Sequence, residues 1–506
     1  MDAQKSQPHL QTIPLLMEAA APEAGSEQCD SPTTPLVSPT TPRVGSPLLV
    51  ARSLSYLNGL AIVLSLQIGS GIFSTPSAVV HNTSSLIVSI VVWFLAGLLA
   101  WTGAASFIEL GSRIPVNGGM QEFLRYCYGD ALGFLASWSM VFLVKPCSVA
   151  MISLIFSEYL HRAFGDSKEP SPWVLKGLAI LAIVSITTIN LLGLRTSTSI
   201  TNFFLVTKSI GLGSIILVGL TQALLCFSAT GIENTCLKGP ANNSINHSPN
   251  DTWKITGAFT DAVLAALWSY SGWETLSIVT GELKSPSRNI PRVLHSAMAV
   301  VITLFMLANT AYFIILPITE LGKTNTVALD FGREVFGIYG VIFYTCIVGL
   351  SCLGALNVKV FTSGRLTHAA ASRRWFPLYL SVLSNQRTPI RAMLLNSCLA
   401  ITYTLIGKFR GLIVFAGMAE STTVCASVLG VLVLRARPNP DENPSGYRTF
   451  ISNPIIFCSL SVAVVIRSAL EHPIQGVIIV AFYISGFSAY WWHFRGLRET
   501  YYGSIS

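Results

Sequence analysis

The sequence is poor in charged residues. Of its 506 residues only 11% are Asp, Glu, Lys or Arg, while 51% are hydrophobic and the mean hydropathy is +0.58. Soluble domains carry about 25% charged residues. So few charged side chains cannot cover the surface of a water-soluble fold of this size. The composition therefore excludes an ordinary soluble protein over most of the length and indicates a protein embedded in a lipid bilayer.

Patterns typical of metal, nucleic-acid and catalytic sites are also missing. The ten Cys include no Cys-x-x-Cys pair and the eight His are scattered, so we expect no metal, no cofactor and no enzyme activity. The net charge of +8 lies in short segments between apolar runs, without the aromatic and basic stripe of a nucleic-acid-binding protein. Five Cys lie within apolar runs, where we expect buried free thiols: Cys147, Cys346, Cys352, Cys398 and Cys425.

Long apolar runs dominate what is present. Twelve of them reach the roughly 20 residues that a membrane helix needs, which predicts an all-α transmembrane fold. The expected spans are 57–80, 86–111, 129–160, 173–193, 200–222, 258–282, 295–317, 336–366, 388–407, 409–435, 453–470 and 474–495. With a cytosolic N-terminus, the inner segments contain more Lys and Arg than the outer ones, as the positive-inside rule requires. We therefore expect both termini in the cytosol.

Glycosylation sequons agree with this topology. All four lie in segments that the charge rule places outside: Asn82, Asn242, Asn246 and Asn250. Each is an acceptor pattern for N-glycosylation and indicates passage through the secretory pathway. We expect a multi-pass glycoprotein of the plasma membrane, with the vacuolar membrane as the alternative.

The N-terminal segment has a different composition. Residues 1–50 are rich in Ser, Pro and Thr, and Ser-Pro-Thr-Thr-Pro occurs twice. Such a segment buries too little apolar surface to offset the entropy lost on ordering. We expect a disordered cytosolic tail at 1–50, a transmembrane transporter domain at 51–500 and a short cytosolic tail at 501–506.

Small residues interrupt two of the apolar runs, one in each half of the chain. The first run contains Ile68-Gly69-Ser70-Gly71-Ile72 and the second contains Trp268-Ser269-Tyr270-Ser271-Gly272. Irregular backbone is tolerated at membrane depth where it lines a cavity or is buried in protein. Paired interruptions point to a substrate site near the bilayer midplane. The alternative is that the glycines only allow close helix packing.

The residues around these interruptions resemble the L-type amino acid transporters of the amino acid–polyamine–organocation superfamily. The similarity is collinear over residues 55–435, and the Ser/Pro/Thr tail and glycine–hydrophobe pattern look most like the fungal, methionine-permease-like branch. The matching segments are Asn58-Gly59-Leu60-Ala61-Ile62, residues 68–73 with Pro76, Val279-Thr280-Gly281-Glu282, Pro286-Ser287-Arg288-Asn289, and Ser351-Cys352-Leu353-Gly354 with Asn357.

The resemblance implies a fold of two inverted five-helix repeats, spans 1–5 and 6–10, with unwound helices 1 and 6 and two peripheral helices. It implies that the amides of residues 70–72 bind an amino acid carboxylate. The carbonyls of Trp268, Ser269 and Ser271 would accept from the ammonium. Trp268 also stands where the family places an aromatic gate that favours apolar substrates; otherwise it is an aromatic at a helix contact.

Three charged residues inside the spans are candidates for coupling. The resemblance implies that Lys208 carries its charge where sodium-coupled relatives bind a cation, and hence sodium independence. Glu274 and Lys359 depart from the family pattern, and we expect them to form a neutralising ion pair, with Lys145 as the competing partner. Alternatively, Glu274 carries a proton or selects a cationic side chain.

The expected function is sodium-independent secondary transport of neutral L-amino acids such as Met, Leu or Phe by alternating access. The alternatives are an amino acid-sensing transceptor and a carrier of cationic amino acids or polyamines. Animal members that pair with a glycoprotein heavy chain use a Cys after the third span, and residues 161–172 contain none. We therefore expect an amino acid and the lipid bilayer as partners, without a disulfide-linked heavy chain.

Overall fold

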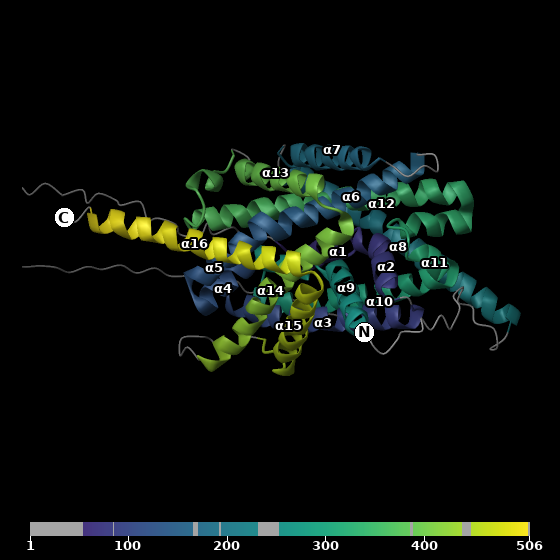
Figure 1. Cartoon of the computed structure of the whole chain (residues 1–506), viewed down its shortest axis with the longest axis horizontal. Helices are drawn as coiled ribbons and strands as arrows, with labels where there is room; N and C mark the ends of the chain where they lie inside the picture. Colours follow the sequence, from purple (N-terminus) through teal and green to yellow (C-terminus); the bar gives the residue numbers. More distant parts are fainter. Residues whose placement is uncertain are drawn as a thin grey trace, which may run out of the picture. The chain divides into compact units, whose positions relative to one another are not determined.

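The computed structural model describes residues 54–83, 85–164, 171–191, 194–230, 252–384, 388–437 and 447–503. These described residues form helices joined by short connections and no named strand, which agrees with the expected all-α class (Figure 1). An isolated parallel bridge joins Leu54 to Leu283. The tail at 1–50 and the sequons at Asn242, Asn246 and Asn250 lie outside the described residues.

Apolar runs that lack internal Pro or Gly clusters give long helices, and the interrupted runs give pairs of shorter ones. The first half contains α1 (Tyr56–Gln67), α2 (Gly71–Thr83), α3 (Leu86–Arg113), α4 (Met120–Tyr128), α5 (Asp130–Ser139), η1 (Met140–Val144), α6 (Lys145–Phe164), α7 (Pro172–Leu191) and α8 (Leu194–Thr230). The second half contains α9 (Thr252–Tyr270), η4 (Trp273–Glu282), α10 (Pro286–Ile315), α11 (Ile318–Leu321), α12 (Val327–Ser372), η5 (Leu378–Ser381), α13 (Ile390–Ile406), α14 (Phe409–Ala436), α15 (Ser452–Glu471) and α16 (Pro473–Gly503).

Nine helices of the described chain are long and apolar enough to cross a bilayer, and the bent pair α1–α2 makes a tenth. The two other expected spans fall short of that test. α13 is apolar but has only 17 residues, and α9 ends where η4 takes over. The count of twelve spans and the inverted repeat therefore stay predictions.

Both interrupted runs break at the residues that the sequence singled out. α1 ends at Gln67 and α2 begins at Gly71, with a bend of 42° between them. α9 ends at Tyr270, and Gly272 has a φ of +121°, a conformation that favours glycine. The ten residues of η4 then form a 3₁₀ helix, an unusually long run of a helix type that often marks a hinge.

The third span contains a π-helical segment, η1, directly before Lys145-Pro146. Pro146 has no backbone N–H and its ring crowds the preceding turn. The wider π turn accommodates this defect without ending the helix. The result is a fully buried Lys145 side chain in the middle of a long span.

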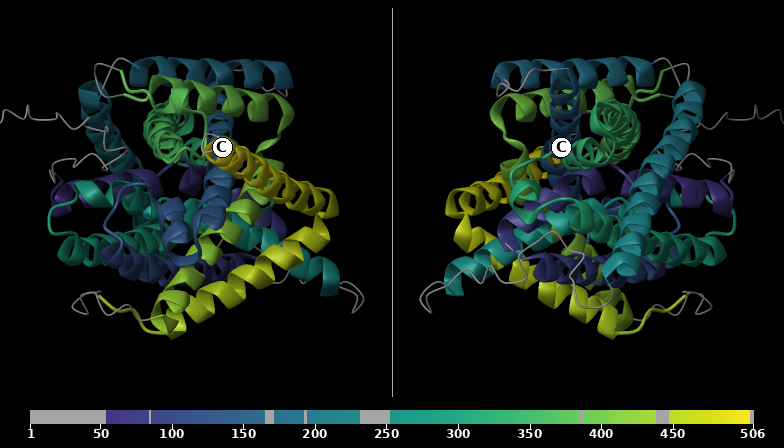
Figure 2. Two further views of the ribbon diagram at one scale, coloured as in Figure 1. Left: turned by 90° about the vertical axis from the view of Figure 1, so that its left-hand side faces the viewer. Right: turned by 90° about the vertical axis from the view of Figure 1, so that its right-hand side faces the viewer.

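The C-terminal helices lie at the periphery of the bundle (Figure 2). α16 contacts α5, α14 and α15, and its central residues are largely exposed. Two cysteines differ from expectation, because Cys346 and Cys398 are exposed, whereas the other three expected thiols are buried. A membrane helix is apolar on its lipid-facing side as well, so an apolar run does not by itself predict burial within the protein.

Candidate functional site

The two helix interruptions are in direct contact. A Cβ atom added to Gly71 would lie 2.8 Å from Ser269 Oγ and 3.0 Å from Ser269 Cα. In the same way, a Cβ added to Gly272 would lie 2.9 Å from Leu66 Cβ. Each glycine therefore sits where the other interrupted segment approaches. This is the close packing that the sequence left as an alternative, and it does not exclude a binding role for the same backbone.

Side-chain hydrogen bonds also join the two interruptions. The hydroxyls of Thr75 and Ser269 are 2.5 Å apart, and Gln67 Nε2 donates to the Tyr270 carbonyl at 3.0 Å. All four groups are buried in the bundle. These contacts fix the register of α1 and α2 against the end of α9, and a movement of one interrupted helix must therefore involve the other.

The first interruption presents backbone amides at a helix start. Gly71 and Ile72 begin α2, so their amides have no acceptor one turn earlier within that helix. Such amides, at the positive end of a helix, suit a carboxylate. The Ser269 hydroxyl covers Gly71, and residues 68–72 are buried. A carboxylate therefore reaches these amides only after Ser269 moves away.

The second interruption uses one of its expected acceptors internally. The Trp268 carbonyl accepts from the Ser271 amide at 3.2 Å and from the Ser271 hydroxyl at 2.7 Å. A carbonyl oxygen has two lone pairs, so these bonds occupy both. An ammonium group would bind the Trp268 carbonyl only by displacing the Ser271 hydroxyl.

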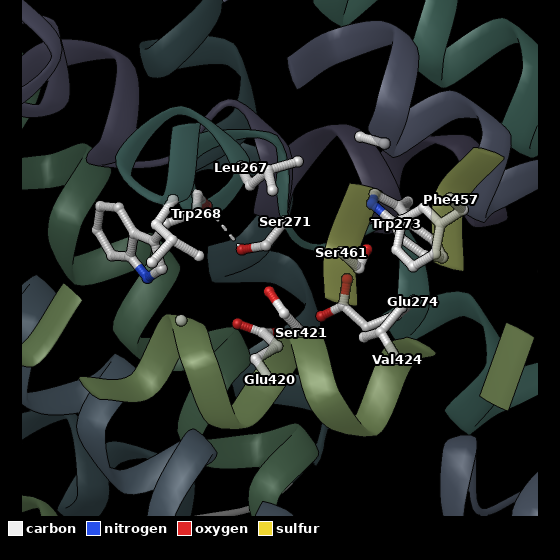
Figure 3. Close-up of a pocket in the computed structure, with 13 residues that line it drawn as sticks. Leu267, Trp268, Ser271, Trp273, Glu274, Glu420, Ser421, Val424, Phe457 and Ser461 are labelled. Atoms are coloured by element: carbon white, nitrogen blue, oxygen red, sulfur yellow. Dashed lines mark hydrogen bonds between the residues drawn. The ribbon is translucent and has the colours of Figure 1, made fainter. Parts of the chain in front are cut away.

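A cavity opens beside the second interruption (Figure 3). Its empty volume is about 530 Å³, which includes open space toward its mouth. Residues of α3, α9, η4, α14 and α15 line it, among them Trp268 and Ser271. Ser70 and Gly71 are not among its lining residues, so the substrate site expected at the paired interruptions stays a prediction.

Trp268 forms a wall of this cavity. Its side chain is 8% exposed and meets the Phe409 ring edge-to-face, with ring centroids 5.9 Å apart. Leu264 and Leu267 of the same helix also line the space. The indole therefore packs against an apolar surface. This position is compatible with an aromatic gate over the substrate and equally with a simple contact between helices.

The buried carboxylate of Glu274 has a different partner from the one expected. Its Oε1 lies 3.7 Å from Lys145 Nζ, and its Oε2 accepts from the Gly272 amide at 2.6 Å. No ion pair within 4.0 Å joins Glu274 to Lys359 among the residues described. Lys145, the competing partner, is thus the lysine in direct contact, while Lys359 interacts with Glu274 electrostatically. The two lysines lie on different helices, and spacing along the chain does not decide which one reaches the carboxylate.

A fourth charged residue, Glu420 of α14, was missed. It lines the cavity together with Glu274 and interacts electrostatically with Glu274, Lys359 and Lys145. The signal was present in the sequence, because a carboxylate in the middle of an apolar run is costly and usually functional. Together, Lys145, Glu274, Lys359 and Glu420 form a cluster, here called the charge cluster, to which α6, η4, α12 and α14 each contribute one member.

Lys208 lies apart from the charge cluster, at the first interruption. Its side chain is fully buried, and Nζ donates to the Ser65 carbonyl at 2.7 Å. Ser65 belongs to the last turn of α1, where exposed carbonyls favour a cation. Cys352 of α12 interacts with both Lys208 and Ser70. The amine of Lys208 is thus held next to the break between α1 and α2.

Asn82 is the one sequon residue within the described residues. It lies in the last turn of α2, and its side-chain amide donates to the Ala78 carbonyl at 3.0 Å. The side chain is partly buried. Its use as a glycosylation site stays a prediction.

Comparison with known proteins extends the similarity over the described bundle. The sequence profile of the family described as "Amino acid permease" matches residues 54–490. The b(0,+)-type amino acid transporter 1 of Mus musculus is 32% identical over 443 residues, which cover 87% of each chain. The Homo sapiens protein of the same name is 31% identical over 442 residues, again 87% of each chain. The large neutral amino acids transporter small subunit 2 of Oryctolagus cuniculus is 29% identical over 455 residues, 89% of this chain and 82% of the relative.

Proposed function

Because this chain belongs to the amino acid permease family, we propose that it is a sodium-independent secondary transporter of neutral L-amino acids such as Met, Leu or Phe. One observation carries the proposal: two broken membrane helices meet at Gly71 and Ser269, beside a cavity walled by Trp268. Broken helices supply backbone groups that recognise the part common to all amino acids. Their relative movement provides alternating access.

The proposed site divides substrate recognition between two surfaces. The amides at the start of α2 suit the carboxylate, as set out above for Gly71 and Ile72. The cavity beside α9 offers Trp268, Trp273 and Phe457 to an apolar side chain. The Ser269 hydroxyl covers Gly71 and is the group that a carboxylate bound at these amides would displace.

A competition panel tests this specificity. The chain is expressed in a host deficient in amino acid uptake, and labelled L-leucine is offered with an excess of each unlabelled amino acid in turn. We expect Met, Leu and Phe to suppress the signal most strongly. Absence of leucine uptake, together with uptake of labelled L-lysine that Arg suppresses, would replace the neutral specificity with the cationic alternative, which the carboxylates of Glu274 and Glu420 on the cavity favour.

Sodium independence is expected from the buried ammonium of Lys208. Its contact with the Ser65 carbonyl holds the amine at the first interruption, where the resemblance implies that sodium-coupled relatives bind a cation. Replacing external sodium by choline should leave the initial rate of labelled leucine uptake unchanged. A steep loss of uptake in choline would refute this role.

The finer assignments are part of the same proposal. We propose twelve spans in two inverted repeats, glycosylation of the outer sequons and residence in the plasma membrane. We also place the chain in the fungal, methionine-permease-like branch, on the evidence of its tail and glycine pattern, although the relatives compared above are animal proteins. One of them is named a small subunit. We propose that this chain has no disulfide-linked heavy chain, because residues 161–172 contain no Cys.

A further inference from the structure

Two carboxylates from different elements face the cavity beside the second interruption. Glu274 comes from η4 and Glu420 from α14, and Figure 3 shows both side chains directed toward the same space. We propose that Glu420 binds a proton that is carried inward together with the amino acid. This inference rests on the proposed transport function and specifies what drives it.

The carboxylates of the charge cluster line the cavity, and its lysines do not. Glu274 and Glu420 line the space, whereas Lys145 and Lys359 are not among the lining residues and are 1% and 6% exposed. A cation that enters the cavity therefore meets the carboxylates first. The hydroxyls of the cavity-lining serines provide further oxygen atoms, but no acidic or basic group.

Glu274 is held in its charged form by direct contacts. The Gly272 amide donates to one carboxylate oxygen at 2.6 Å, and Lys145 Nζ lies 3.7 Å from the other. Both contacts stabilise a carboxylate over a carboxylic acid. Glu420 has no ion pair within 4.0 Å and no hydrogen bond of its side chain among the described residues. Of two like charges on one cavity, the less constrained one is the group that a proton neutralises at lower cost.

The elements packed around Glu420 contribute few charges to the cavity region. Besides Glu420 on α14, the groups that interact with it are Lys145 on α6, Glu274 on η4 and Lys359 on α12. The cavity-lining residues of α3, α9 and α15 are not titratable. With all four members ionised, the cluster has no net charge. One bound proton gives it a charge of +1, and an inside-negative membrane potential then favours inward movement of the loaded carrier.

The same groups connect protonation to the helix break. Glu274 binds the amide of Gly272, the residue whose positive φ ends α9, while Ser271 lines the cavity and holds the Trp268 carbonyl. Neutralising Glu420 removes a negative charge next to Glu274 and leaves Glu274 as the one ionised carboxylate of the cluster facing Lys145 and Lys359. The proton is therefore bound where it can alter the hinge that admits the amino acid.

The test uses the purified full-length protein in liposomes that contain a pH-sensitive dye. A potassium gradient with valinomycin clamps an inside-negative potential, and no pH gradient is imposed. We expect addition of external L-leucine to acidify the lumen, whereas addition of buffer alone does not. A parallel assay follows exchange of labelled for unlabelled leucine, which needs no net proton movement.

Two variants assign the proton to Glu420. In Glu420→Gln, leucine-driven acidification should fall to the level of protein-free liposomes, with a smaller loss of exchange. Glu420→Asp keeps a carboxyl group and should retain acidification. Glu320→Gln is the matched control, because Glu320 in α11 is an exposed carboxylate whose side chain is 65% accessible.

Each outcome decides a different claim. Leucine exchange without any acidification by the native protein overturns the proton inference and leaves the transport function intact, even if every variant misfolds. Absence of exchange by the native protein overturns the transport function itself. Acidification that persists in Glu420→Gln removes the assignment to Glu420. Glu420-dependent exchange of lysine or arginine without proton movement would identify the carboxylates as a subsite for a cationic side chain and overturn the inference.

Discussion

Replacing Gly71 with Val is expected to abolish amino acid uptake while the protein still reaches the cell surface. The first atom of the new side chain would lie 3.0 Å from Ser269 Cα, and a backbone atom cannot rotate away as a flexible side chain can. The branched side chain would also fill the position proposed for the substrate carboxylate. The two broken helices would therefore be forced apart at the site itself. Labelled leucine uptake and surface biotinylation measure the two effects separately.

Gly213→Val is the matched control for this substitution. Gly213 also lies in a membrane helix, α8, and a Cβ added there would meet no atom within 4 Å. Both variants place a β-branched residue in a helix, so the intrinsic helix cost is similar. Uptake by Gly71→Val at the rate of the Gly213→Val control would contradict the proposed contact between the interruptions.

Neutralising Glu274 alone is expected to destabilise the protein strongly, because it leaves Lys145 buried without its counter-charge. Removing one partner of a buried ion pair costs about 3–5 kcal/mol. The double variant Glu274→Gln/Lys145→Met removes both charges and should recover part of that loss. Thermal unfolding of the purified variants in detergent measures the free energies, and uptake shows whether function follows stability.

The same design distinguishes the two lysines of the charge cluster. Lys145 is the lysine in direct contact with Glu274. The interaction free energy of this pair in a double-mutant cycle should therefore exceed that of Lys359 and Glu274. The corresponding double variant with Lys359→Met provides the comparison. Strictly additive losses for Glu274 and Lys145 would show that the 3.7 Å contact contributes no stability.

The positions of the helix breaks could be predicted from the sequence. Small residues interrupt apolar runs at 68–71 and 268–272, and helices α1 and α9 end there. Such breaks depend on local backbone preferences, which the sequence expresses directly. Lys208 was also recognisable, because an isolated ammonium in an apolar run needs a partner. The structure supplies the Ser65 carbonyl.

The partners of buried charges could not be predicted in the same way. Three lysines and two glutamates lie in different spans, and the bundle geometry alone decides that Lys145 reaches Glu274. Glu420, like Glu274, is a carboxylate within an apolar run, and it could have been found on that ground. It was overlooked because α14 lay outside the segments that carried the family resemblance most clearly. The position of the cavity, beside α9 and not between both interruptions, likewise depends on side-chain packing.

The central claim is that this protein moves an amino acid through the site where the two broken helices meet. The most direct test follows labelled L-leucine into liposomes that contain the purified full-length protein. We predict saturable accumulation in the lumen that excess unlabelled leucine suppresses and that Gly71→Val lacks. Leucine binding by the native protein without passage across the bilayer would contradict the claim and identify a sensor in place of a carrier.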